Sequence, residues 1–262
     1  MKSRILYSVL FFVFSFAVFS QTYPPAAGQP GSTAIHFSDD LFVGWASGVE
    51  VERGYLNISN PDFEINGSNR ASYGRPQDAT GIPNNQVVSL GDGGVAVATF
   101  ENPIADGPGF DFAVFENGFN DTYLELAFVE VSSNGIDFFR FPSHSLTQTG
   151  IQVGSFGELN PTELNNLAGK YRAMYGTPFD LAELENHPLL DKNRITHVKI
   201  IDVVGSIHPD FGTYDSFGNI INDPFPTPFE SGGFDLDAIG VINEAQLSTE
   251  NFKLSALKIL PN

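Results

Sequence analysis

Carboxylates gather around a glycine-rich turn at residues 107–109 and again in the late apolar run FDLDAIGVIN. Calcium takes roughly six to eight oxygen ligands from carboxylates, amides and backbone carbonyls, and glycine lets carbonyls converge on an ion. Asp235 and Asp237 stand two apart, which places both on one face of a regular strand. The sequence therefore predicts a structural calcium site; the alternative is that these residues form turns and solvated surfaces. The predicted ligands are Asp106, Asp111, Glu116, Asn117, Asp235 and Asp237.

Asp202 lies inside the otherwise apolar run IIDVV. A buried carboxylate without a partner is costly, so Asp202 must be satisfied. Three solutions are open: it accepts hydrogen bonds from nearby backbone, it pairs with Lys199 or Arg194, or it joins the ion site. We expect local pairing.

Paired carboxylates could also hydrolyse a glycosidic bond, with Glu125 and Glu130, or Glu116 and Asp202, as acid and base. A chain with 31 acidic residues offers such pairs by chance. The five histidines show no spacing typical of zinc ligands. No serine stands in a G-x-S-x-G motif. We therefore expect a non-catalytic protein and keep a secreted glycoside hydrolase as an alternative.

The long segment 206–231 mixes aromatic and polar side chains. Aromatic faces beside polar groups are suited to recognising sugars. The alternative is that the aromatic rings fold back to bury the segment itself, as long ordered loops must. The candidate ligand-binding residues are Tyr214, Asp215, Phe217, Asn219 and Phe225.

Short apolar runs bounded by glycine, proline and asparagine must position these groups. The chain has 25 Phe and 26 Gly, a composition that favours an all-β domain. Asn134-Gly135 lies between alternating runs and predicts a hairpin over 125–141. The segment 142–195 carries Leu and Ala at helical spacing, which predicts one or two short helices. Further strands are expected at 49–52, 87–90, 95–100, 110–116, 196–205 and 234–243. The result is a single β-sandwich with a short helical insertion.

The N-terminal residues 1–20 read as a secretory signal peptide, with Lys2 and Arg4 before an apolar run. That run is shorter than the roughly 20 residues that a membrane span needs. Residues 21–34 are rich in proline and glycine and are expected to be a linker. The sandwich is then placed at 35–243 and a C-terminal tail at 244–262. We expect a secreted or cell-surface protein, without a membrane span.

The charge balance excludes one class of partner. The formal net charge is -18, and removal of Lys2 and Arg4 with the leader would make it -20. Such a surface repels phosphate backbones, so nucleic acid is not expected as a partner. The chain has no cysteine, so its fold must rest on a hydrophobic core, with a metal ion as possible support. We expect a monomer.

The hairpin sequence VEVSSNGIDFFRF resembles that of galactose-binding-like jelly-roll domains, the group that includes discoidin and many carbohydrate-binding modules. More narrowly, SLGDGG, DGPGFDFAVFENGF, THVKIIDVVGSI and GFDLDAIGVIN are similar, in this order, to bacterial exported cell-surface proteins. The resemblance covers most of residues 35–243 and implies an all-β jelly-roll β-sandwich, often with a calcium ion beside a terminal strand.

The resemblance implies a module that binds a carbohydrate or another surface ligand. An alternative is a surface partner in the uptake of a cobalamin-type cofactor, because distantly similar proteins occur in such systems. The tail KILPN is similar to the beginning of the type IX secretion sorting signal of Bacteroidetes and stops there.

Overall fold

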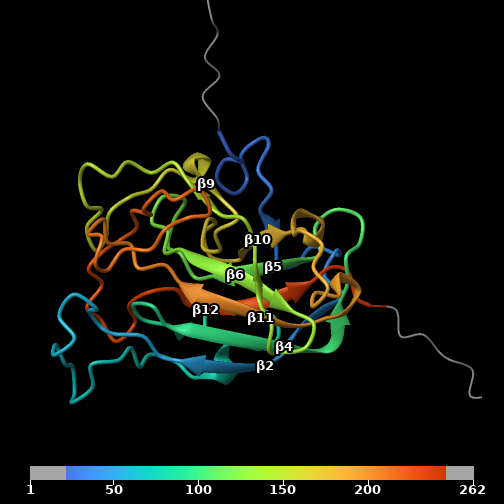
Figure 1. The fold of residues 1–262 in the computed structure, drawn as a ribbon, viewed down its shortest axis with the longest axis horizontal. Helices are drawn as coiled ribbons and strands as arrows, with labels where there is room; N and C mark the ends of the chain where they lie inside the picture. The colour runs from blue at the N-terminus through green and yellow to red at the C-terminus, as the bar shows by residue number, and fades with distance from the viewer. Residues whose placement is uncertain (1–21, 246–262) are drawn as a thin grey trace, which may run out of the picture.

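The computed structural model describes residues 22–245 (Figure 1). The predicted signal peptide and nearly all of the predicted tail lie outside these residues. The described chain is an all-β sandwich, which confirms the predicted fold class. Its strands form one curled antiparallel sheet and one small two-stranded sheet.

The large sheet has a single strand path with one additional short strand beside it. Along the path lie β1 (Ile35–His36), β10 (Tyr175–Phe179), β5 (Phe112–Glu116), β12 (Asp235–Val241), β2 (Gly44–Glu52), β4 (Val95–Ile104), β11 (Ile195–Asp202), β6 (Ala127–Ser132) and β7 (Phe139–Arg140). Off this path, β3 (Val88–Ser89) pairs with β12, and β8 (His144–Ser145) pairs with β9 (Leu164–Asn165) in the small sheet.

Strand β2 joins the two halves of the large sheet. Its first residues, Gly44 and Trp45, pair with β12, whereas the stretch from Ala46 to Glu52 pairs with β4. The register shifts between Ala46 and Gly48, at the point where the strand changes partner. A shift of this kind bends a strand, and here it lets the sheet curl over its own core.

One core fills the space between the two halves. The same cluster of buried side chains contains Phe112 and Ile239 from one half and Val131 and Ile200 from the other. Strand β12 is buried along its whole length, whereas β4 alternates between buried and half-buried residues. The apolar runs in the sequence therefore mark the strands that cross the interior.

The helical insertion expected at 142–195 consists of 3-10 turns. Residues 22–245 contain η1 (Pro76–Ala79), η2 (Pro161–Glu163), η3 (Leu181–Glu183) and η4 (Lys192–Arg194), and no longer helix. Asn166 and Gly169 have positive φ, which interrupts any helix in LNNLAGK. No helix in this part of the chain has the length and apolar character to cross a membrane.

The predicted hairpin is present, with a shorter return strand than expected. Glu130 pairs with Arg140 and Val131 with Phe139. The Asn134 side-chain oxygen accepts hydrogen bonds from the backbone N–H groups of Ile136 and Asp137, both at 2.9 Å. The turn is therefore built around the Asn134 side chain.

The described part of the predicted linker lies against the sandwich. The Tyr23 N–H donates to the Thr162 carbonyl at 2.8 Å, and the hydroxyls of Thr33 and Tyr171 are 2.9 Å apart. Ala27 is buried. The segment has no regular secondary structure, as expected from its proline and glycine, but it packs against the domain.

Three groups of loops gather at one end of the sandwich, on the left in Figure 1. Strands β2, β5 and β11 end there, and β4, β6 and β12 begin there, because neighbours in the sheet are antiparallel. The loops at this end are 53–87, 117–126 and 203–234. We call it the loop end.

Candidate metal centre

Six of the buried carboxylates at the loop end form one group, and each of the six is at most 8% exposed. Glu116 and Asp202 are the last residues of their strands, and Asp235 is the first of its strand. Because antiparallel neighbours alternate in direction, these strand ends all lie at the same end of the sandwich. We call the group the acidic cluster; it comprises Asp92, Glu116, Glu125, Asp202, Asp223 and Asp235.

Three of these residues are close enough to share an ion. Glu116, Glu125 and Asp235 each offer a carboxylate oxygen, and these atoms all lie within 4.8 Å of one another. Calcium binds oxygen at about 2.3–2.6 Å, so two ligands of one ion can be up to about 5 Å apart. The spacing of the three oxygens therefore suits a single calcium ion.

Glu116 has a free oxygen. Its Oε2 accepts a hydrogen bond from the Gly118 N–H at 2.7 Å, whereas Oε1 is buried and has no hydrogen-bond partner. Buried polar atoms in folded proteins are nearly always bonded, to protein, water or an ion. An unpartnered carboxylate oxygen within a set of three is the arrangement expected of a cation ligand.

The electrostatics of the cluster point the same way. Burial raises the pKa of Glu116 and of Glu125 well above the usual range, and neighbouring Asp235 raises both further. Burial also raises the pKa of Asp235 to about 7, although the Ser89 hydroxyl and Arg53 favour its ionised form. Burial and like charge therefore disfavour the ionised forms of these groups, and a bound divalent cation would relieve that cost.

The other members of the cluster bind backbone. Asp202 accepts from the Gly93 N–H at 2.9 Å and the Phe234 N–H at 2.7 Å. Asp223 accepts from the Leu126 N–H at 2.8 Å. The expected local satisfaction of Asp202 is thus confirmed through backbone donors. Lys199, one of its two suggested partners, forms an ion pair with Glu130 instead, at 3.1 Å.

The structure divides the predicted ligand set. Asp106 and Asp111 group with Asp180 near the start of β5, whereas Glu116 is at its other end. Strands rise about 3.3 Å per residue, so the two ends of β5 are too far apart for one ion. Asp111 accepts from Gly107 N–H and Leu181 N–H, both at 2.7 Å, and from the Asn243 amide at 2.9 Å. It is a satisfied structural group.

Asp237 does not share the cation geometry of Asp235. Its two oxygens accept from the backbone N–H groups of Asn84 and Asn85, both at 3.1 Å. The register of β12 against β5 shifts between Leu236 and Ala238, which interrupts the alternation assumed from the sequence. Asp237 therefore anchors the loop before β3. Asn117, the remaining predicted ligand, is half-buried and follows Glu116 directly after the end of β5.

Glu125 completes the group of three but is absent from the predicted ligand set. The sequence suggests it only as a hydrolytic partner of Glu130. A signal was present, because Glu125 stands between Leu124 and Leu126 in the apolar run LELAFVEV, as Asp202 stands in IIDVV. A carboxylate inside an apolar run marks a buried charge that needs a partner.

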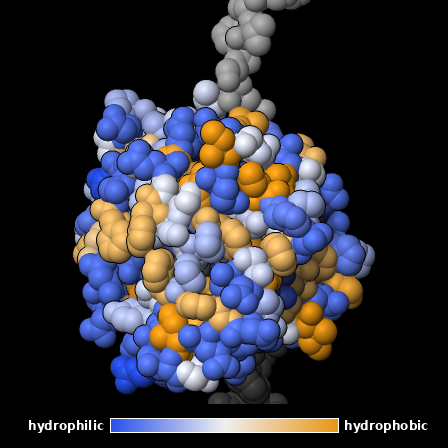
Figure 2. All heavy atoms as spheres, turned by 90° about the vertical axis from the view of Figure 1, so that its left-hand side faces the viewer, coloured by the Kyte–Doolittle hydropathy of each residue, from blue (hydrophilic) through white to orange (hydrophobic). Residues whose placement is uncertain are grey.

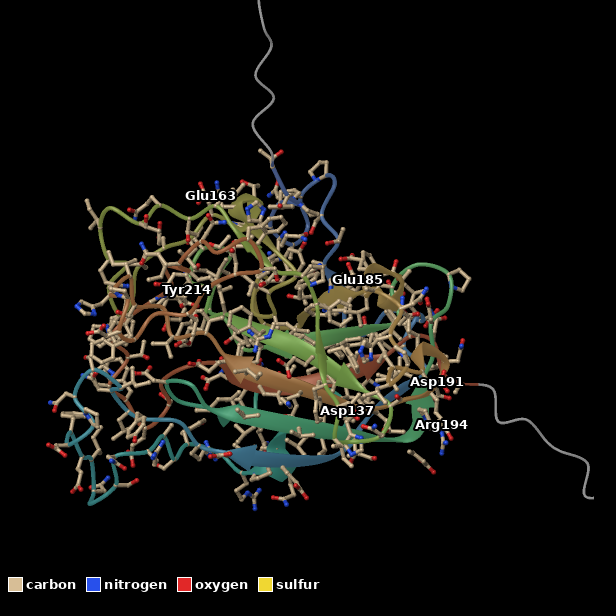
Figure 3. The ribbon with its side chains drawn as sticks, viewed as in Figure 1. Asp137, Glu163, Glu185, Asp191, Arg194 and Tyr214 are labelled. Atoms are coloured by element: carbon tan, nitrogen blue, oxygen red, sulfur yellow. The ribbon has the colours of Figure 1, made fainter. Side chains whose placement is uncertain are left out.

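The residues predicted to bind a sugar have mixed roles. Asp215 accepts from the backbone of Phe217 at 2.9 Å and of Asn219 at 2.8 Å, and the Asn219 amide donates to it at 2.9 Å. Phe225 is buried, which fits the alternative that rings fold inward. Tyr214 and Phe217 are 47% and 68% exposed, and Figure 3 labels Tyr214 at the loop end.

The fold and the site together define an all-β sandwich with a buried acidic cluster at its loop end. Comparison of the chain with protein-family models, curated proteins and solved structures finds no match.

Proposed function

We propose that this chain is an exported, non-catalytic binding module whose loop end is stabilised by a calcium ion bound to Glu116, Glu125 and Asp235. The observation that carries the proposal is the buried, unpartnered Oε1 of Glu116 beside two more buried carboxylates. The ligand is a carbohydrate or another surface molecule, held by the loops that the ion steadies. The leader-like N-terminal sequence supports export.

The positions of the candidate acids and bases support a non-catalytic role. Glu116 and Asp202 are 1% and 2% exposed, so a polysaccharide has no access to them. Glu130 is held in ion pairs with Arg140 at 2.9 Å and Lys199 at 3.1 Å, so both of its oxygens already have partners within the sheet. A glycosidase needs both carboxyl groups at the sugar.

Thermal unfolding with and without calcium tests the proposal. Extracellular calcium sites have dissociation constants of about 10⁻⁴ to 10⁻³ M. At ~10 mM calcium, binding to the folded state alone raises the Tm of a domain of this size by about 3 to 10 °C relative to chelator. An unchanged Tm contradicts the proposal.

A matched pair of variants locates the effect. Glu116→Gln removes one charged ligand and should abolish most of the calcium-dependent rise in Tm. Glu185→Gln changes an exposed glutamate away from the acidic cluster, labelled in Figure 3, and should keep the full rise. Equal responses of both variants would place the ion elsewhere.

A further inference from the structure

Four aromatic side chains form a row at the loop end. Successive ring centroids are 5.5 Å apart for Phe119 and Tyr123, 6.3 Å for Tyr123 and Phe156, and 5.6 Å for Phe156 and Phe229. The interplanar angles are 28° or 29° throughout, so the rings stack with an offset. We call these four residues the aromatic row.

Most of the aromatic row faces solvent. Phe119 is 81% exposed, Phe156 72% and Phe229 39%, whereas Tyr123 is largely buried beneath them. The rings come from three separate loops, and Figure 2 shows hydrophobic side chains among hydrophilic ones on this end of the molecule. Exposed apolar side chains gathered in one place mark interaction sites more often than scattered ones.

The polar neighbours of the rings indicate the chemistry of a ligand. Exposed Asn120, Glu158 and Glu230 lie within two residues of a ring in the sequence, and two of them are acidic. An anionic ligand would be repelled by a chain of net charge -18. A purely apolar ligand would desolvate these carboxylates without bonding them. A neutral sugar ring avoids both problems: it carries no negative charge, and it offers a C–H face to the aromatic rings and hydroxyl donors to the carboxylates.

The aromatic row is connected to the candidate metal centre through one loop. Glu116 directly precedes the loop 117–126 and Glu125 is near its other end, and between them the loop carries Phe119 and Tyr123. Burial raises the pKa of the Tyr123 hydroxyl and neighbouring Glu125 raises it further, so the two side chains lie close together. A cation bound by both glutamates would close the loop at its base and fix these rings in place.

We infer that the aromatic row is the binding platform for a neutral saccharide chain, and that the cation at Glu116 and Glu125 closes the loop that carries it. This inference rests on the proposed function and names the ligand class and the surface that contacts it. It places the contact on Phe119 and Phe156 instead of on Tyr214 and Phe217.

Affinity gel electrophoresis of the full chain tests the inference. The probes are four neutral polysaccharides (hydroxyethylcellulose, laminarin, xylan and galactomannan) and one anionic polysaccharide, alginate, in calcium and in chelator. At least one neutral probe should bind in calcium, and alginate should bind less. Phe119→Ala and Phe156→Ala should each weaken binding about tenfold, the change expected from losing one stacking contact. Ile136→Ala, an exposed apolar change next to Asp137 at the opposite end in Figure 3, should bind as the wild type does.

The Tm measured on the same samples separates this inference from the proposed function. If calcium raises the Tm but no neutral probe binds, or the ring variants bind equally well, the platform is overturned and the calcium site stands. If binding requires the rings but calcium changes neither the Tm nor the affinity, the platform stands and the cation part is overturned. Tighter binding of alginate than of every neutral probe also overturns the assignment.

Discussion

Glu116 and Glu125 lie at opposite ends of one loop, yet a carboxylate oxygen of each lies within 4.8 Å of the other. Nine positions separate them in the sequence, and the strands they flank, β5 and β6, belong to different halves of the sheet. Two buried acids of like charge raise each other's pKa. Their proximity is therefore unfavourable unless a proton or a cation lies between them.

Glu116→Gln should have opposite effects in the two conditions of the melting experiment. In chelator at pH 8 the variant should have a higher free energy of unfolding than wild type, by on the order of 1 kcal/mol, because buried Glu116 must either take up a proton or carry an uncompensated charge on folding, and glutamine does neither. In calcium the wild type should be the more stable, because it alone keeps the full ligand set. Denaturant unfolding in both buffers measures this, and a variant less stable in both would argue against a charge-repulsion role for Glu116.

Asp92 should make the free energy of unfolding of the calcium-free protein fall as the pH rises. Burial raises its pKa to about 7, partly opposed by the hydrogen bond from Ile58 N–H. The folded state thus keeps a proton that the unfolded chain releases near pH 4. The free energy of unfolding should therefore be highest below about pH 4 and should fall by on the order of a few kcal/mol between about pH 4 and pH 7.

Asp92→Asn supplies the control for this pH dependence. Asparagine is neutral and can still accept a hydrogen bond from the Ile58 N–H. The free energy of unfolding of the variant should therefore change less between pH 4 and 7 than that of wild type. The variant should match wild type at pH 4.5 and exceed it at pH 7.5, as measured by urea unfolding in chelator. Parallel curves for the two proteins would show that Asp92 is not the titrating group.

Asp215 should prove to be a structural residue. Burial opposes its ionisation, but hydrogen bonds from Asn219, Ser145 and Phe217 outweigh burial and lower its pKa. Asp215→Ala should lower the free energy of unfolding by about 2–3 kcal/mol, because several backbone donors lose their acceptor. Since the pKa is lowered, this difference should be full above about pH 4 and shrink below it. If the folded variant binds saccharide as tightly as wild type, Asp215 has only a structural role. If the folded variant loses affinity, Asp215 belongs to the ligand-binding site.

Phe112 should be among the most sensitive core positions. Its ring stacks on Phe179 at 5.4 Å and meets the edge of Phe141 at 5.8 Å, with all three buried. Phe112→Ala should cost about 3–5 kcal/mol of unfolding free energy, and Phe156→Ala about 0.5 kcal/mol or less, because the second ring is mostly exposed. Chemical denaturation of the two variants gives the comparison.

The strands were predictable because the apolar residues in them serve only to fill the core, so their spacing follows the geometry of a strand. Val198 and Ile200 alternate toward the core, and the apolar run at β12 marks a strand buried on both faces. The short helices expected in 142–195 are 3-10 helices of three residues each, because capping side chains there favour a single local turn over a longer α-helix. Asn160 accepts from the Thr162 N–H and starts a three-residue turn, and Asn166 then takes a positive φ.

The candidate site was only half predictable, since it depends on which strand ends meet. Glu116 and Asp235 both belong to the predicted ligand set, and the pairing of β5 with β12 brings them together. Asp111 was predicted together with Glu116 because both lie around the glycine-rich turn, but strand β5 separates the two residues. Glu125 and the ring of Phe156 come from distant segments, and only the register of the sheet and the packing of loops bring them to the site.

The ends of the strand order have a consequence for the behaviour of the protein in concentrated solution. Within residues 22–245, the large sheet finishes in β1 and β7, each only two residues long. A longer exposed edge would offer a row of unpaired N–H and C=O groups to other molecules. Here the long strands all lie inside the sheet, so a second copy of the chain has few free backbone N–H and C=O groups with which to pair. The sandwich is thereby protected against edge-to-edge aggregation without a disulfide.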